Sequence, residues 1–563
     1  MAEKIRSREE IAREDTWAME DLYASDAAWL EDLEKLKTLG AKLPEYAGKL
    51  SASAQTLLEY QKLGEEISVL LDSLANYAQR KSDEDTRNAV YQDLTGKLTK
   101  VWVQLGADTA FEVPELLSIS DEQMEKFYEE VPELNLYRRH FDSIRRKRAH
   151  VLSESEEKLL AMAGEMAGTP EEVYSLFADA DLTFRPALDA NGEEHQITQG
   201  SYIAAMESPD RTLRKNAFES LYAGFGAYKN TVAATLAGQV KQLEFFSKAR
   251  HYSSPLEASL DATEVPVSVY HELIEAVHQN MDKMHRYMRL RKKLLGVDEL
   301  HMYDLYTPLV GASEERIPFA EAKKTVAQAL GVMGERYGKI LQEGFENRWI
   351  DVYENTGKRS GAYSAGARVH PYVLLNYTGT LDSEFTLAHE MGHAIHSYLS
   401  NKTQPIVYSD YVIFVAEVAS TCNEALLMQH LLKTTTDKKQ RAYLINHFLE
   451  QFRTTLYRQT MFAEFELKMA ELSAQGVTLT ADVLCEEYRK LNALYYGEDV
   501  VLDEEIALEW ARIPHFYYNY YVFQYATGYA AAIALSEGIL REGEPAVERY
   551  LGFLSGGCSK SPI

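Results

Sequence analysis

The chain of 563 residues carries 59 Lys and Arg against 86 Asp and Glu, which gives a formal net charge of −27. Because nucleic-acid binding depends on clustered Lys and Arg, this balance argues against a nucleic-acid partner. A chain of this length with 46% hydrophobic residues is expected to form a globular protein with more than one lobe.

The first 110 residues are predicted to be helical. The sequence SREE at Ser7–Glu10 matches a capping box, in which a serine and a glutamate satisfy backbone donors at a helix start. Apolar residues then recur at helical spacing from Ala54 to about Leu105, with few helix-breaking residues among them. Residues 1–110 are therefore expected to form an N-terminal helical region.

Residues 111–200 form the second predicted region, which is helical and ends in a hairpin. Helix starts are indicated near Ser118–Asp121 and Ser153–Glu156. The strand-like stretches Leu182–Leu188 and Glu194–Thr198 flank an Asn-Gly pair, which favours a tight turn. A basic cluster precedes them, and in so acidic a chain it is interpreted as a face of internal salt bridges rather than a binding patch. Its members are Arg138, Arg139, Arg145, Arg146, Lys147 and Arg148.

The remaining residues, 201–563, are predicted to form one larger domain. Long helices come first, and short strand-like stretches follow at 349–353, 361–368 and 373–377. These strands either brace the next helix as a structural sheet or offer an exposed edge that pairs with an extended peptide. The two interpretations are compatible.

The motif HEMGH occupies residues 389–393, directly after these strands. His389 and His393 are four residues apart, so on a helix they point to the same side. Two imidazoles at this spacing can supply two corners of a tetrahedral zinc site. Glu390 projects beside the metal, where a carboxylate can act as general base on a zinc-bound water.

The same three polar residues could instead decorate a partly buried helix without any metal. Apolar neighbours such as Leu387, Met391 and Ile395 indicate that this helix is buried beyond one face. Unpaired polar groups are costly in such a place, which favours the zinc site.

A catalytic zinc site needs a third protein ligand and keeps one position open. His396 follows on the same face, but three imidazoles in a row along one helix do not make a tetrahedron. We interpret His396 as a residue that packs beside a ligand or orients it. The following helix, expected from Ser409 to Leu432, carries Glu417 and Glu424 two turns apart. This geometry suits one ligand and one carboxylate that orients a histidine.

Several segments of the chain resemble the thimet-oligopeptidase-like zinc peptidases, and within them the bacterial oligoendopeptidase F branch. HEMGHAIH followed by VAEVASTCNE carries the resemblance, together with TWAMEDLY at 16–23, GKRSGAYSAG at 357–366 and IPHFYYNYYVFQYATGYAAA near the end. The resemblance covers almost the whole chain.

The resemblance implies one zinc ion per chain, with His389, His393 and Glu417 as ligands, Glu390 as base and Glu424 as a further acidic residue. It implies that a histidine and a tyrosine of the late segment stabilise the oxyanion, with His515 and Tyr521 as first candidates. Residues expected to bind substrate are Gly361, Ala362, Tyr363, Tyr518 and Tyr525. Core packing is the alternative for any one of the tyrosines.

The resemblance also implies a mainly α-helical, two-lobed gluzincin fold of the neurolysin-like type. This fold has a small β-sheet beside the zinc helix and a deep substrate channel. The implied function is zinc-dependent hydrolysis of internal bonds in short unfolded oligopeptides, with short peptides as partners. The alternative is a non-catalytic helical peptide-binding protein with a structural zinc, which would need four protein ligands.

Three cysteines, none in a CxxC pair, predict a reducing compartment without a disulfide framework. No apolar run is long enough for a bilayer, and the N-terminus shows no signal-peptide core, so we expect a cytoplasmic protein without a membrane partner. The chain ends at GGCSKSPI, where similar proteins continue into a further helix. Whether a C-terminal tail is missing stays open at this point, and less order is expected near Cys558.

Overall fold

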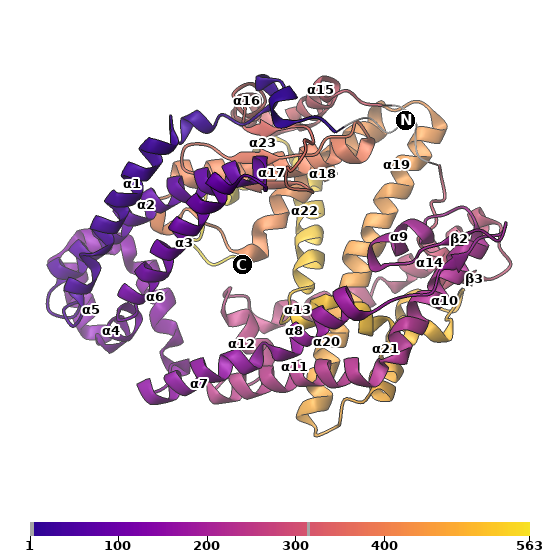
Figure 1. The fold of residues 1–563 in the computed structure, drawn as a ribbon, viewed down its shortest axis with the longest axis horizontal. Coiled ribbons are helices and arrows are strands. Elements are labelled where there is room, and N and C mark those ends of the chain that lie inside the picture. The colour runs from indigo at the N-terminus through magenta and orange to yellow at the C-terminus, as the bar shows by residue number, and fades with distance from the viewer. Residues whose placement is uncertain (1–4, 312–315) are drawn as a thin grey trace. The chain divides into compact units, whose positions relative to one another are not determined.

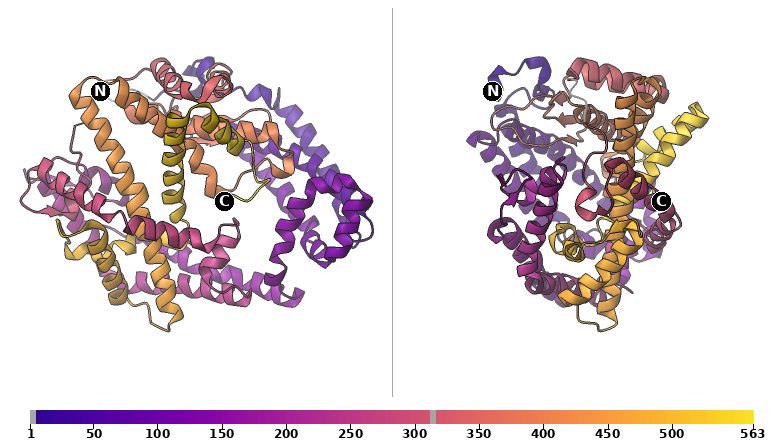
Figure 2. Two further views of the ribbon diagram at one scale, coloured as in Figure 1. Left: turned by 180° about the vertical axis from the view of Figure 1, so that it is seen from behind. Right: turned by 90° about the vertical axis from the view of Figure 1, so that its right-hand side faces the viewer.

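The computed structural model describes residues 5–311 and 316–563, and it divides into two compact units assembled from separated segments. Unit 1 comprises Met1–Arg148, Glu314–Lys433 and Ala531–Ile563, and unit 2 comprises Ala149–Ser313 and Thr434–Ala530. Both units are mainly helical (Figures 1 and 2), which confirms the predicted fold class. The predicted boundaries near residues 110 and 200 divide the sequence differently and stay predictions.

Unit 1 combines the N-terminal helices with the helices that follow the central strands. They are α1 (Asp26–Gly40), α2 (Ala54–Glu84), α3 (Ala89–Asp108), α4 (Glu112–Ser118), α5 (Asp121–Glu130), α6 (Arg138–Arg145), α15 (Phe319–Ala329), α16 (Gly334–Glu346), α17 (Leu381–Thr403), α18 (Ile413–Thr434) and α23 (Glu544–Leu554). The last residue of α18 falls in unit 2, and α22 (Phe523–Glu542) begins in unit 2 and ends in unit 1.

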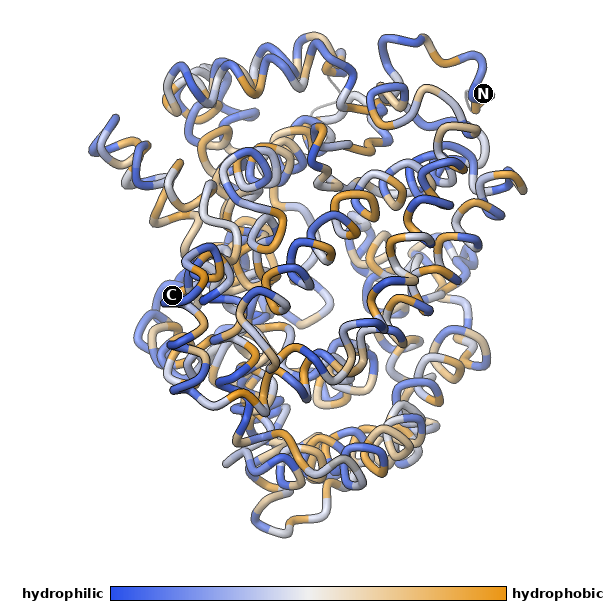
Figure 3. The backbone as a smooth tube through the Cα atoms, turned by 90° about the vertical axis from the view of Figure 1, so that its left-hand side faces the viewer, coloured by the Kyte–Doolittle hydropathy of each residue, from blue (hydrophilic) through white to orange (hydrophobic). Residues whose placement is uncertain are grey.

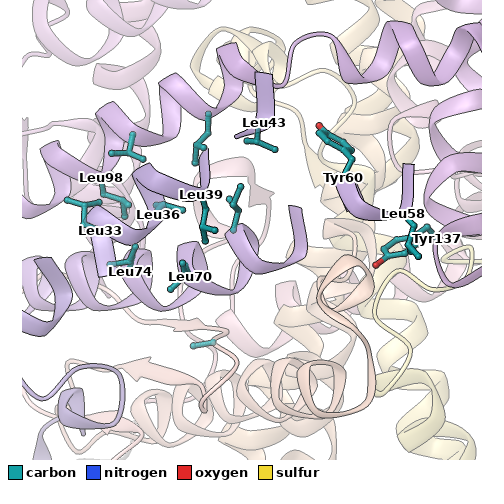
Figure 4. Close-up of a cluster of buried hydrophobic side chains, with 14 of the residues drawn as sticks. Leu33, Leu36, Leu39, Leu43, Leu58, Tyr60, Leu70, Leu74, Leu98 and Tyr137 are labelled. Atoms are coloured by element: carbon teal, nitrogen blue, oxygen red, sulfur yellow. The ribbon is translucent and has the colours of Figure 1, made fainter. Parts of the chain in front are cut away.

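The N-terminal helices pack around a core rich in leucine (Figure 4). Leu36 of α1 and Leu74 of α2 are fully buried in it, because apolar residues recur every three or four positions on each helix. Figure 3 shows the resulting alternation of hydrophilic and hydrophobic residues along the helices. The long predicted helical pattern is interrupted at 85–88, where the Asn88 side chain accepts from Val90 N and caps α3.

The predicted strands of unit 1 form a small three-stranded sheet. They are β4 (Ile350–Asp351), β5 (Tyr363–Ala365) and β6 (Tyr372–Leu374), in the order β4-β6-β5. β6 pairs in parallel with β4 and antiparallel with β5, so β5 is an edge strand. The N-terminal segment braces the sheet, since Trp17 donates a 2.7 Å hydrogen bond from Nε1 to the carbonyl oxygen of Val373.

Unit 2 is a second helical assembly with two short strand pairs. Its helices are α7 (Glu154–Ala167), α8 (Thr169–Leu176), α9 (Gln199–Met206), α10 (Arg211–Ala227), α11 (Lys229–Ala249), α12 (Pro255–Asp261), α13 (Val267–His278), α14 (Met281–Leu295), α19 (Lys438–Gln451), α20 (Arg458–Ala474) and α21 (Ala481–Tyr496). A 3₁₀-helix, η12 (Glu504–Arg512), follows α21 and the strand β7 (Val500–Val501).

The predicted hairpin of unit 2 is present but short. β1 (Ala187–Leu188) pairs antiparallel with β2 (Glu194–His195), and Gly192 in the turn has a φ of 83°. Sequence patterns did not indicate the second pair, in which β3 (Leu300–His301) lies parallel to β7 (Val500–Val501). Two-residue strands so far apart in sequence carry too little periodicity to be recognised.

Several local predictions can be compared directly with contacts. The capping boxes at Ser7 and Ser153 are confirmed. Arginines of the basic cluster form internal ion pairs as predicted: Arg138 with Glu125 at 2.7 Å, Arg148 with Asp121 at 3.3 Å, and Arg145 also with Asp121.

The C-terminal segment is held to the rest of unit 1. The segment near Cys558, expected to be less ordered, is tied to the rest of unit 1 by a 3.1 Å hydrogen bond from Cys558 N to Tyr408 O.

Among the helices of residues 5–311 and 316–563, none has the length and apolar character needed to cross a membrane.

Candidate functional site

Helix α17 carries the HEMGH motif, and most of its residues are buried. Its N-terminus is capped by Thr380, whose side chain accepts a hydrogen bond from Ser383 N. Acidic residues in the first turn interact favourably with the positive end of the helix dipole. The i, i+4 spacing places His389 and His393 on one face with ring centroids 4.9 Å apart. The helix thus presents two imidazoles side by side.

A glycine inside the motif lets α18 approach α17 closely. A Cβ on Gly392 would lie 2.6 Å from the carbonyl oxygen of Ala419 and 2.6 Å from Ser420 Cα. Nearby, Asn423 donates a 3.0 Å hydrogen bond from Nδ2 to the carbonyl oxygen of Ala388. Sequence reasoning missed both devices, although a glycine within a buried helix was a signal for close packing.

The approach of α18 brings a carboxylate to the two histidines. Glu417 Oε2 lies 3.4 Å from His389 Nε2 and 3.4 Å from His393 Nε2. Ligands about 2.0–2.2 Å from a tetrahedral zinc ion are themselves about 3.3–3.6 Å apart. The donor set therefore fits zinc, and the described residues offer three of the four ligands that a tetrahedral ion needs.

Neighbouring side chains orient two of these three groups. Glu424 accepts a short hydrogen bond from Nδ1 of His389, which leaves Nε2 of that ring facing Glu417. Ser420 donates a 2.8 Å hydrogen bond to Oε2 of Glu417, a contact that sequence reasoning also missed. Of the two acids two turns apart on α18, Glu417 thus faces both histidines and Glu424 supports one of them.

The charges of the group reinforce this arrangement. Burial would lower the pKa of His389, but the Glu424 hydrogen bond and carboxylate charges raise it to about 9. Burial would raise the pKa of Glu417, but the histidines, chiefly His393, hold it at about 2. A cation bound at Nε2 of His389 would have to displace the proton that this raised pKa favours.

Glu390 lies beside the group without belonging to it. The residue is only 6% exposed, and its Oε2 has no hydrogen-bond partner among the described residues. Burial raises its pKa, against the opposing charges of His389 and His393. A buried carboxylate oxygen without a partner, next to a set of metal donors, is available to exchange a proton.

His396, on the next turn of α17, packs instead of joining the donor set. Its ring stacks on Tyr411 with centroids 3.6 Å apart, and Phe553 of α23 lies on it as well. Burial lowers its pKa to about 3, so the ring is neutral. Of the two roles considered for His396, packing agrees better with these contacts.

The segment 357–366 is fixed to other parts of unit 1 by polar contacts. The side chain of Lys358 is fully buried and donates to backbone oxygens that include Tyr353 O and Leu375 O. Gly361, with a φ of 81°, accepts a 2.8 Å hydrogen bond from Asn376 at its carbonyl oxygen. The hydroxyl of Tyr363 donates to Asp83 of α2. Tyr363 therefore directs its hydroxyl to α2, and Ala362, which is partly exposed, precedes it on the chain.

The tyrosine-rich segment lies in unit 2 and brings its four predicted residues together. His515 has its ring centroid 5.5 Å from Tyr518 and 6.1 Å from Tyr525, and Tyr521 lies 5.3 Å from Tyr525. Tyr518 is 45% exposed, and the other three are partly exposed. The aromatic residues of the segment that form the core are others, such as Phe516.

A strained turn in this segment is held by residues that sequence reasoning missed. Asn519 and Tyr520 have φ values of 52° and 57°, which are unfavourable for residues with side chains. Three helices anchor the turn, because Gln239 donates to Tyr517 O and Asn519 Oδ1, Ser259 donates to Asn519 O, and Glu466 accepts from Tyr520 N. The anchors are scattered through the sequence and had no local signal.

Comparisons with known proteins give a consistent result. The model of peptidase family M3 matches residues 204–563, and that of the oligopeptidase F region matches residues 115–184. Oligopeptidase PepF of Bacillus subtilis is 47% identical, over 100% of this chain and 84% of that protein. An oligoendopeptidase F homolog of Lactococcus lactis is 42% identical over 99% of this chain and 93% of its own.

Solved structures agree with the sequence relatives. The crystal structure of oligoendopeptidase F from Enterococcus faecium superposes with a TM-score of 0.71 at 38% identity, covering 94% of this chain and 91% of its own. That of a candidate peptidase from Chlamydophila abortus reaches a TM-score of 0.93 at 35% identity, covering 100% of this chain and 94% of its own.

Proposed function

Because the chain belongs to peptidase family M3 and its oligopeptidase F branch, we propose that it hydrolyses internal bonds of short unfolded peptides with one zinc ion. Membership in this family makes the chain a metalloendopeptidase. The parts of the proposal that go further are the metal, the residues that act, the peptide substrates and a reducing, cytoplasmic location. The deep substrate channel stays a prediction.

One observation carries the proposal: Glu417 lies 3.4 Å from each of the two histidines, at the separation expected of zinc ligands. Zinc held by His389, His393 and Glu417 would acidify a water molecule and polarise the peptide carbonyl. Glu390 accepts the proton of the attacking water on its unpartnered oxygen. The same carboxyl then delivers that proton to the leaving amine nitrogen.

The tyrosine-rich segment supplies neutral donors in this proposal. Tyr521 and His515 donate hydrogen bonds to the oxygen that gains negative charge, while Tyr518 and Tyr525 contact the peptide. Burial and the charge of Arg458 lower the pKa of His515, so its imidazole is neutral near pH 7. Gly361, Ala362 and Tyr363 are proposed to contact the peptide from the edge of the small sheet.

The alternative function, a binding protein with a structural zinc, has less support. Among the described residues the donor group contains three side chains, whereas structural zinc usually has four. Cys422, the cysteine closest in sequence to Glu417, is fully buried and lies outside that group. An open fourth position favours the catalytic function.

Metal content and peptide cleavage test the proposal together. The purified chain should contain one zinc ion by elemental analysis and cut a mixed peptide library at internal bonds. A chelator should abolish cleavage, and added zinc should restore it. A native disulfide-bonded protein is the control substrate and should stay intact. A chain that holds no zinc after supplementation, or cuts equally well after complete metal removal, would contradict the proposal.

A further inference from the structure

Unit 2 contains a buried charge cluster that the proposed reaction does not use. Arg458, at the start of α20, donates a 2.6 Å hydrogen bond from Nη2 to Oε1 of Glu509 in η12. Arg512, at the end of η12, approaches the same oxygen from 3.7 Å. The other oxygen of Glu509 accepts a 2.6 Å hydrogen bond from the hydroxyl of Tyr488. Two arginines therefore share one glutamate, and both of its oxygens are already occupied.

The guanidinium groups of this pair are largely without acceptors. Each arginine carries five N–H donors, and the described residues provide one hydrogen bond to Arg458 and none to Arg512. Nε of Arg512 is buried and has no partner in the part of the chain that the structure describes. Aromatic rings lie against both groups instead. The Phe462 ring centroid is 4.4 Å from Cζ of Arg458, and the Tyr202 ring centroid is 5.0 Å from Cζ of Arg512. Rings do not replace oxygen acceptors in number or direction.

A second pair of arginines in unit 2 shows what a satisfied cluster looks like. Arg291 and Arg453 also share one glutamate, Glu450, at 2.8 and 2.6 Å. Arg453 makes a further hydrogen bond to Glu450, and Arg291 donates to the carbonyl oxygens of Thr307 and Asp304 as well. Both clusters thus pair two arginines with one glutamate. The guanidinium N–H donors find protein acceptors in the cluster of Arg291 and Arg453 and largely lack them in the cluster of Arg458 and Arg512.

The unfilled N–H donors, rather than the charge ratio that both clusters share, point to a missing anion. Arg458 and Arg512 carry two positive charges and Glu509 carries one negative charge, so the cluster has a net charge of +1. Each arginine side chain is only 13% exposed. A buried charge without a counter-ion is costly, and a ligand of opposite charge would remove that cost. A group with a single negative charge matches this balance better than a dianion does.

The cluster adjoins the segment that the proposed function assigns to substrate. Arg458 is near enough to His515 for its charge to lower the pKa of that imidazole. His515 in turn contacts the rings of Tyr518 and Tyr525. All of these residues belong to unit 2, and Arg458, Arg512 and His515 retain part of their exposure.

We propose that Arg458 and Arg512 form a binding site for a carboxylate group of the peptide substrate. The inference rests on the proposed function, because a peptide offers singly charged carboxylates at its C-terminus and on acidic side chains. Planar guanidinium groups match a carboxylate through paired N–H···O bonds. Such a site would select peptides by the presence of this group, in addition to the residues at the cleaved bond.

Matched peptides test the proposal on the wild-type enzyme. One sequence without acidic residues is prepared as a free acid and as a C-terminal amide, and a third peptide is amidated but contains a glutamate. KM and kcat are measured for each. The KM of the free acid should be about 10–100-fold below that of the neutral amide, because charge-assisted hydrogen bonds are lost in the amide. A low KM for the glutamate peptide would place the carboxylate on a side chain instead.

Variants assign the preference to these arginines. Arg512→Met should raise the KM of the carboxylate peptide to that of the neutral amide, while the amide keeps its kinetics within about twofold. Arg512→Lys should retain part of the preference, because it retains the charge. Arg289→Met removes an exposed arginine of the same unit, and the preference should persist. Among the described residues Arg512 makes no hydrogen bond, and its contacts are an ion pair at 3.7 Å and one aromatic ring, so its methionine variant should lose little melting temperature.

The outcomes separate this inference from the proposed function. Cleavage of all three peptides with KM values within twofold would overturn the carboxylate site and leave the peptidase assignment standing. A preference that survives in Arg512→Met would also overturn it. Failure to cleave any peptide with zinc present would count against the proposed function. Fluorescence anisotropy with labelled peptides on Glu390→Gln would then still decide whether binding depends on the carboxylate.

Discussion

The metal donor group and the tyrosine-rich turn are positioned in opposite ways. His389 and His393 need only regular helix geometry, and one glycine contact sets the distance to α18. Asn519 and Tyr520 instead adopt strained backbone angles and depend on side chains from three other helices. The first site is fixed by its own elements, whereas the second is fixed by remote anchors. Substitutions in the two regions should therefore affect the protein in different ways.

The largest effect is expected from Glu390→Gln in the donor region. The amide cannot accept the proton, so kcat should fall by about 10²–10⁴-fold. Zinc content should stay at one per chain, because Glu390 is not among the donors. Glu417→Ala is the matched variant and should lose the metal along with activity. Near-normal turnover in Glu390→Gln would show that another group is the base.

Removal of a donor from the turn should have the next largest effect. Tyr521→Phe or His515→Ala should lower kcat by about 10²–10³-fold if that group stabilises the developing charge. KM should change little, since the contact strengthens only as charge develops. Phe516→Leu, a core substitution in the same segment, is the control and should act on melting temperature rather than kcat. Variants at 515, 518, 521 and 525 that all stay within threefold of wild-type kcat would contradict this role.

A smaller effect is expected where a carboxylate orients a ligand. Glu424→Ala removes the hydrogen bond to Nδ1 of His389 and should weaken zinc affinity by about 10–100-fold. Competition with a chromophoric chelator measures this loss. Glu424→Gln keeps an acceptor and should fall in between. Unchanged affinity in the alanine variant would show that packing alone orients His389.

The smallest effect should come from Glu466, a remote anchor of the turn. Glu466→Ala leaves Tyr520 N without its acceptor and should cost about 1–3 kcal/mol of unfolding free energy. Burial raises the pKa of Glu466 to about 8, so the carboxyl is protonated at pH 7 and glutamine can replace it. Glu466→Gln should therefore keep both stability and kcat. A glutamine variant as damaged as the alanine variant would contradict a neutral carboxyl.

The same pKa gives the wild type a pH dependence. A carboxyl whose pKa is raised by folding holds its proton longer than the unfolded chain does, so stability falls as pH rises from about 4.5 to 8. Glu466→Gln has no such proton and should lose less melting temperature over this interval. The difference between the two curves, measured by calorimetry, isolates the contribution of this residue.

The contrast also explains how much could be predicted from the sequence. Helical spacing placed His389 and His393 together, and the two-turn spacing of Glu417 and Glu424 placed both on one face of α18. Spacing alone did not decide which of the two acids faces the histidines, because that depends on the register between α17 and α18. Gln239, Ser259 and Glu466 were missed, since tertiary contacts bring them to the turn from helices far apart in sequence.

The unmatched arginines were missed for a related reason. Arg458 begins α20 and Arg512 ends the 3₁₀-helix η12, and nothing in the sequence distinguishes them from Arg291 and Arg453. Only the number of acceptors around each guanidinium separates the two pairs. The mainly helical fold and the small sheet followed from patterns and the family resemblance, whereas β3 and β7 were too short to recognise.

Because of the contact at Gly392, we expect this position to tolerate few substitutions in a mutagenised library. A methyl group there would meet the α18 backbone rather than a flexible side chain, so relief requires moving a whole helix. Clones that survive selection for peptide cleavage should keep glycine at 392, as they keep the proposed ligand His393, even when the codon for Met391 varies. A homologue with a larger residue there should carry compensating changes along α18, near Ala419 and Ser420. Substitution patterns at these three positions would then vary together across generations.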